Sequence, residues 1–206
     1  MSDAAAVRGR GKRKSAVRSS ARSTVYGLRS TAGGVKTTPR DKRAAGSDLD
    51  IDVQCAVSKR NVPRADKLRA WAKAAYAAAL LPKIEDRGPK TVPSLTLRIV
   101  GSPESRSLNR TWRGKDKPTN VLSFPAGDVP AGGGGAPLGD IAICAPVVLR
   151  EAREQGKLRT AHWAHMVAHG VLHLLGYDHV KPRDAKLMEA REVEILAQFG
   201  YADPYQ

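Results

Sequence analysis

The stretch HGVLHLLGYDH at residues 169–179 says more about fold and function than any other part of the chain. His169 and His173 are four residues apart. On a helix this spacing places two side chains on one face, with Cβ atoms roughly 5–6 Å apart. Gly176 permits the left-handed backbone that often ends a helix, and His179 can then turn back toward the same point. The pattern predicts a metal site at the C-terminal end of a helix.

The residue types in this stretch favour zinc. Three imidazole nitrogens at about 2.0–2.1 Å leave a fourth zinc position open for water, as in catalytic rather than structural zinc sites. We therefore predict one Zn²⁺ ion per chain, held by His169, His173 and His179. A lone histidine would more often pack in the core or face solvent. The two other histidines, His162 and His165, continue the same helical stripe and are expected in the core or beside the ligands.

The histidine spacing matches the metzincin metalloprotease pattern HExxHxxGxxH at every position but one. Those proteases have a glutamate after the first histidine, where it acts as the general base. This chain has Gly170 at that position. The sequence thus predicts a zincin-like metal helix that lacks the base needed for peptide cleavage.

Composition restricts the partners and the compartment. The formal net charge is +15 and the pI about 10.2, which favours a polyanionic partner, nucleic acid before membrane. Aromatic residues make up only 5% of the chain, so broad base-stacking platforms are not evident. No apolar run reaches the ~18 residues that span a bilayer. The two cysteines, Cys55 and Cys144, are expected to be reduced and buried, which suits the cytoplasm.

The first 48 residues differ in composition from the rest. Twelve basic and three acidic residues give this segment +9 of the +15 net charge. It lacks hydrophobic periodicity, so we expect residues 1–48 to be a basic disordered extension. Its arginine-rich and serine-rich bias resembles that of an organelle transit peptide. It is compatible with an RNA-binding arm, a dispensable extension, or upstream sequence translated from a start codon placed too early.

Hydrophobic periodicity over residues 49–206 predicts one folded domain. The four glycines Gly132–Gly135 are expected to form a flexible loop between strands. The order of elements predicts an α+β domain, with a small mixed four-stranded sheet covered by helices and the zinc-binding helix in the core. Strands are expected near residues 49–57, 95–100, 120–124 and 138–144, and helices near 64–81, 102–112, 146–155, 160–173 and from about 182 to 199.

Two segments together carry a resemblance to a known family. They are LNRTWRGKDKPTNVLSFP at residues 108–125, and residues 169–179 followed by the ending GYADPY at residues 200–205. On these motifs the chain resembles the YbeY family of bacterial rRNA maturation factors, which are metal-dependent endoribonucleases. The resemblance covers about residues 49–206. Asn120 departs from it, because many relatives have aspartate there.

The resemblance implies a single-strand-specific, zinc-dependent endoribonuclease domain at residues 49–206. It implies action in 16S rRNA 3′-end maturation and ribosome quality control in the cytoplasm. The 16S precursor, the small ribosomal subunit and ribosome-associated proteins are the implied partners. The family's zinc ligands fall on His169, His173 and His179, with His169 also assigned to catalysis, and its functionally important arginine falls on Arg113.

Elementary chemistry suggests further roles for the segment around Arg113. The planar guanidinium of Arg113 matches a phosphate group and suits substrate positioning. Lys115 and Lys117 are expected to contact the RNA backbone, with a solvated loop as the alternative. Asp178 either orients a ligand imidazole or packs as a loop carboxylate. The nucleophile, water or the RNA 2′-OH, stays open.

Two other functions fit the same residues. One is a ribosome-assembly factor in which zinc holds the fold and the chain works by binding pre-ribosomal particles. The other is a hydrolase acting on a small or peptide substrate, although Gly170 argues against the peptide form.

Overall fold

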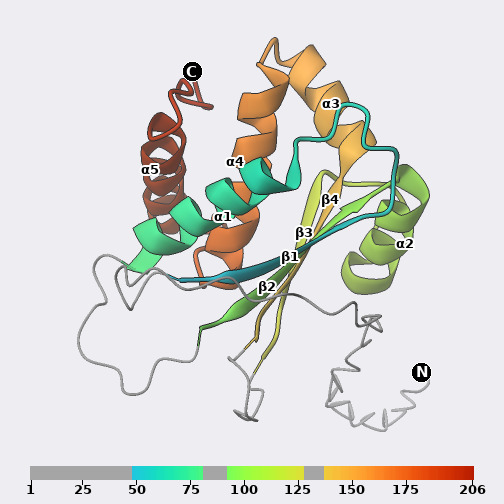
Figure 1. The fold of residues 1–206 in the computed structure, drawn as a ribbon, viewed down its shortest axis with the longest axis horizontal. Coiled ribbons are helices and arrows are strands. Elements are labelled where there is room, and N and C mark those ends of the chain that lie inside the picture. Colours follow the sequence, from blue (N-terminus) through green and yellow to red (C-terminus); the bar gives the residue numbers. More distant parts are fainter. Residues whose placement is uncertain (1–47, 81–91, 128–136) are drawn as a thin grey trace, which may run out of the picture. The chain divides into compact units, whose positions relative to one another are not determined.

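The computed structural model describes residues 48–80, 92–127 and 137–206. These residues form one four-stranded sheet and five helices (Figure 1). The elements are, in chain order, β1 (Asp50–Cys55), α1 (Ala65–Leu80), β2 (Ser94–Val100), α2 (Ser102–Arg113), β3 (Val121–Pro125), β4 (Pro137–Cys144), α3 (Ala145–Glu154), α4 (Arg159–Leu174) and α5 (Pro182–Ala197).

The sheet is mixed, with strand order β1-β2-β4-β3. Strands β1, β2 and β4 are parallel, and β3 pairs antiparallel with β4 as an edge strand. Residues 141–144 of β4 are fully or nearly fully buried, as expected for a central strand covered on both faces. The predicted α+β class with a small mixed sheet is confirmed.

Helices cover both faces of the sheet. Figure 1 shows α1, α4 and α5 together on one side and α2 on the other. Helix α4 lies in the main hydrophobic core and buries Trp163, Val167, Val171 and Leu172. The helix predicted to carry the histidines is therefore central to the domain.

Gly170 explains how closely α4 approaches the sheet. A Cβ atom at residue 170 would lie 2.9 Å from Cγ2 and 3.0 Å from Cδ1 of Ile141 on β4. On the neighbouring edge strand, the Ser123 hydroxyl donates a hydrogen bond of 3.1 Å to the carbonyl oxygen of Gly170. A side chain at residue 170 would therefore require Ile141 or the helix itself to shift, and the long glutamate of the proteases would require the largest shift.

One prediction about the cysteines is wrong, and two predicted segments lie outside the described residues. Cys55 was expected to be buried, but it is exposed at the end of an outer strand, whereas Cys144 is buried; both thiols are free. The predicted disordered segment lies, up to residue 47, outside the described residues, as does the Gly132–Gly135 loop. None of the described helices combines the length and the apolar character that crossing a membrane requires.

Candidate metal centre

The three predicted ligands come together at the end of α4. Donor atoms of His169, His173 and His179 all lie within 4.8 Å of one another. The Nε2 atoms of His169 and His173 face each other at 3.1 Å. Two nitrogens bound to one tetrahedral zinc lie about 3.3 Å apart, given zinc–nitrogen bonds of about 2.0–2.1 Å. The donor set and its spacing therefore fit one zinc ion with a position left open.

The backbone after α4 explains why His179 returns to the helix. Gly176 has φ 87°, in the left-handed region predicted for it. Its amide bonds the carbonyl of His173, and the amide of Tyr177 bonds the carbonyl of Leu172. These two bonds form a Schellman motif, which ends a helix and reverses the chain. The reversal brings His179 beside the two helical histidines, with its ring centroid 5.5 Å from that of His169.

A buried carboxylate supports His169 from behind. Glu192 on α5 has 0% exposed surface. Its Oε1 accepts a bond of 2.8 Å from Nδ1 of His169, and its Oε2 accepts bonds from Nε2 of His165 at 2.9 Å and from the Tyr205 hydroxyl. Burial raises the pKa of Glu192, but the hydrogen bonds from His165 and His169 outweigh it and lower the pKa to about 2.

The consequence is a defined tautomer for His169. A charged carboxylate at Nδ1 keeps the proton on that nitrogen, so Nε2 carries the lone pair and points toward the other two histidines. The same arrangement of carboxylate, histidine and metal recurs in zinc proteins.

Sequence reasoning missed Glu192 and Tyr205. Glu192 lies on the buried face of α5, among Met188, Ile195 and Leu196. An acidic residue within the apolar stripe of a helix was the available signal, because carboxylates are almost never fully buried without partners. Tyr205 belongs to the ending quoted above, but nothing in the sequence linked it to Glu192.

His165, His169 and Glu192 form a second group that meets the same 4.8 Å criterion for ligand-type atoms. Its separations of 2.8 and 2.9 Å are those of charge-assisted hydrogen bonds, and both carboxylate oxygens are already occupied. The described residues thus contain two groups that are close enough to hold a metal ion. Geometry favours the three histidines.

The environment of His173 keeps it neutral. Burial is the main cause that lowers the pKa of His173 to about 4, and nearby His169 and His179 add to it. A neutral imidazole is the form that binds a metal. Asp178 does not hold a ligand imidazole; its Oδ1 accepts a bond of 2.7 Å from the backbone amide of His179. Of the two roles considered for Asp178, the structure favours the loop carboxylate.

His162 is a core residue away from the three-histidine group. Its Nε2 lies 3.1 Å from Oε2 of Glu151, which also accepts a bond of 3.1 Å from Nδ2 of Asn120. Burial lowers the pKa of His162, although Glu151 opposes this. The amide of Asn120 thus donates to the same carboxylate that lies beside His162.

The predicted RNA-contacting cations lie on a different element. Arg113 ends α2, Gly114 follows with φ 67°, and Lys115 and Lys117 lie in the loop beyond. The loop is tied back to α2 by the buried amide of Asn109, which donates a bond of 2.7 Å to the Lys117 carbonyl. The three cations are exposed, and within the described residues their side chains make no hydrogen bond or ion pair. No described contact joins them directly to the histidines.

A family model and a curated relative give the same family for this chain. Residues 52–200 match the family model described as Endoribonuclease YbeY. A relative of that name from Halorhodospira halophila (strain DSM 244 / SL1) is 49% identical over 163 residues, which cover 78% of this chain and 98% of the relative. The solution structure of TM1509 from Thermotoga maritima shares 24% identity with a TM-score of 0.46, covering 77% of this chain and 99% of that one.

Proposed function

The chain belongs to the YbeY endoribonuclease family, and from this premise we propose that it is a zinc-dependent endoribonuclease specific for single-stranded RNA. Family membership gives the enzyme class, a hydrolase acting on RNA. The zinc ion, the site residues and the cellular substrate are proposals argued below.

The observation that carries the proposal is the convergence of His169, His173 and His179 within 4.8 Å. The low pKa of His173 and the hydrogen bond from His169 to Glu192 leave both helical imidazoles ready to donate a lone pair. When bound, zinc supplies a Lewis acid that activates water or polarises a phosphoryl oxygen. His169 links this centre to the buried network, which is why we assign it to catalysis as well as to metal binding.

Residues of the α2 end and its loop bind the substrate in this proposal. The Arg113 guanidinium binds a phosphate through two parallel N–H bonds and stabilises its charge. Lys115 and Lys117 contact flanking phosphates as point charges. The support is their exposure and their freedom from other partners within the described part of the chain.

For the cellular role we propose 16S rRNA 3′-end maturation and ribosome quality control in the cytoplasm. The substrate is then the 16S precursor in the small ribosomal subunit, with ribosome-associated proteins as further partners. The net charge of +15 supports a polyanionic substrate, and the two free thiols are compatible with a reducing compartment. We further propose that residues 1–48 are an extension separate from the catalytic domain at residues 49–206.

The test uses purified full chain of measured zinc content and a single-stranded RNA that carries the rRNA 3′ end. Wild type is compared with His169→Ala and Arg113→Ala, and with Arg150→Ala on the exposed face of α3 as the matched control. We expect cleavage by wild type and the control only. The chemistry of the product ends distinguishes water from the 2′-OH as nucleophile.

The assembly-factor function stays the second candidate because one observation favours it. Glu192, the carboxylate bonded to His169, is fully buried and committed to three donors, so it is not free to act as a general base. Equal trace cleavage by wild type and both site variants would indicate a contaminating nuclease and support the assembly factor.

A further inference from the structure

We propose that the exposed ring of Trp112 is a stacking platform for one unpaired base of the RNA substrate. The inference rests on the proposed function and adds to it a structural reason for single-strand selectivity. Neither the metal centre nor the predicted phosphate-binding residues require this tryptophan.

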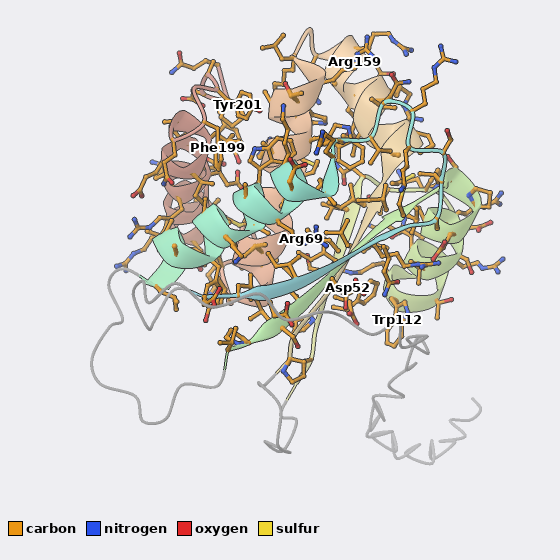
Figure 2. All side chains as sticks on the ribbon, viewed as in Figure 1. Asp52, Arg69, Trp112, Arg159, Phe199 and Tyr201 are labelled. Carbon is orange, nitrogen blue, oxygen red and sulfur yellow. The ribbon has the colours of Figure 1, made fainter. Side chains whose placement is uncertain are left out.

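Trp112 differs from the other two tryptophans of the chain. It is 51% exposed at the end of α2, where Figure 2 labels it, whereas Trp71 is 2% and Trp163 is 1% exposed. Its ring contacts Phe124 of β3 edge-on, with centroids 5.8 Å apart and planes at 66°. This contact holds the ring in place while about half of the residue remains accessible. A large aromatic surface is thus pre-oriented but not covered.

The surroundings of Trp112 select for an anionic ligand. Arg110 precedes it by two residues with a side chain that is 66% exposed, and Arg113 follows it directly. Asp116 is occupied mainly by Arg106, through bonds of 2.8 and 2.6 Å, and only its 4.0 Å contact reaches Arg110. Arg110 and Arg113, which are close to Trp112 in sequence at the end of α2, are therefore left without a short ion pair among the described residues. An aromatic surface among cations matches a base with its flanking phosphates.

A membrane surface would also attract an aromatic ring beside cations. The surface of α2 argues against it. Among the exposed large hydrophobic residues of the described chain, Trp112 is the one on α2, and apart from Pro103 the other exposed residues of this helix are polar or charged. A single ring offers one base a place to stack but gives a bilayer little apolar area to bury.

The ring lies one strand away from the metal helix. Phe124 contacts Trp112, and the adjacent Ser123 bonds the carbonyl of Gly170, next to His169. Neighbouring side chains of a strand point to opposite faces, so β3 separates the ring from α4. Because β3 is an edge strand of the sheet, with no further strand beyond it among the described residues, we propose that the RNA strand runs from the ring to the histidines around this edge.

Selectivity follows from what stacking requires. A base in a duplex is already stacked between its neighbours, whereas an unpaired base can be turned out onto a protein ring. Replacing Trp112 with alanine should therefore weaken binding of single-stranded RNA by about 5- to 150-fold, the range expected for one stacked base. Duplex binding, which depends on phosphates, should change less than about twofold.

Fluorescence gives a direct test on the full chain. Because Trp112 alone among the three tryptophans is exposed, quenching of the intrinsic fluorescence by acrylamide reports mainly on its ring. We expect an unstructured RNA to protect the ring, and a hairpin of the same composition to bind without protecting it. RNA integrity is checked after each titration, and Trp112→Phe should retain most of the affinity because it keeps an aromatic ring.

Leu187→Ala, which removes an exposed apolar side chain from α5, is the matched control and should leave RNA binding unchanged. Thermal melting of each variant identifies any loss of folding. If Trp112→Ala does not fold, the RNA affinity of Trp112→Phe is compared with that of wild type instead. Unchanged quenching with single-stranded RNA bound would overturn the inference, as would protection by anionic phospholipid vesicles instead of RNA. The proposed function is tested separately: it fails if wild type and His169→Ala cleave RNA equally.

Discussion

Replacing Glu192 with glutamine tests whether the buried carboxylate prepares His169 for the metal. Glutamine keeps the volume and one carbonyl oxygen but removes the charge that both histidines bond. In wild type, the ring nitrogen of His165 and the Tyr205 hydroxyl both donate to a carboxylate oxygen. The amide group of glutamine would place its own N–H donors against one of these donors or against the His169 ring. The preference of His169 for a proton on Nδ1 is thereby weakened.

The expected loss is a 10- to 100-fold weaker zinc affinity, as is typical when the partner of a ligand histidine is changed. That range corresponds to about 1.4–2.7 kcal/mol. It agrees with the ~1.5–3 kcal/mol of a hydrogen bond to a charged group. Glu192 is fully buried, so solvent does not screen the interaction.

Zinc affinity is measured by competition with a chromophoric chelator at neutral pH. Glu194→Gln is the control, because it makes the same charge change two residues away, where Glu194 pairs with Arg191 on the surface at 2.7 Å. We expect the control to bind zinc like wild type. Equal zinc affinities for Glu192→Gln and wild type would refute the supporting role, and loss of the folded state in Glu192→Gln would place Glu192 in the stability of the domain instead.

Three further predictions concern packing, pH and the N-terminal segment. Gly170→Ala should lower the free energy of unfolding by up to about 2 kcal/mol, because overpacking costs about 1–3 kcal/mol and the higher helix propensity of alanine returns about 1 kcal/mol. Chemical denaturation measures this. Gly101→Ala is the control for a Cβ that meets no atom closer than 3.5 Å, and any cost there reflects the loss of glycine at the N-cap of α2. A Gly170→Ala variant at least as stable as wild type would contradict the close approach. The pKa of His173 is lowered from 6.5 to about 4 in the folded chain, so the unfolded chain takes up the proton first. Metal-free protein should therefore lose stability as the pH falls from 6.5 toward 4, which thermal melting across that range checks. A melting temperature that does not change over this pH range would be evidence that His173 is not held neutral by burial. Deleting residues 1–48 should flatten the salt dependence of RNA binding if this segment releases counterions from phosphates, whereas an unchanged slope would mark it as dispensable.

Local patterns were sufficient to predict much of the fold. The four strands and five helices follow hydrophobic period and breaker residues, and Gly176 ends its helix as its residue type suggests. The meeting of His169 and His173 also needs only helical spacing. Such features depend on residues close together in sequence, where geometry is set by the backbone alone.

What the sequence could not supply depends on packing between distant elements. Glu192 meets His169 across 23 residues, and only the docking of α5 on α4 brings the two together. The exposure of Cys55 depends on β1 being an outer strand, a property of strand order rather than of local composition. Likewise, the 51% exposure of Trp112 follows from where α2 ends relative to β3.

The close packing at Gly170 also limits which catalytic activities this fold can acquire by single substitutions. Inserting a glutamate, the one change that would complete the peptidase pattern, would first meet Ile141 at 2.9 Å and push helix and sheet apart. A smaller residue at position 141 would have to come before it or with it. On this scaffold, therefore, an evolutionary path from nuclease to protease needs at least a paired substitution, since the first step alone weakens the fold before any new catalysis can be selected.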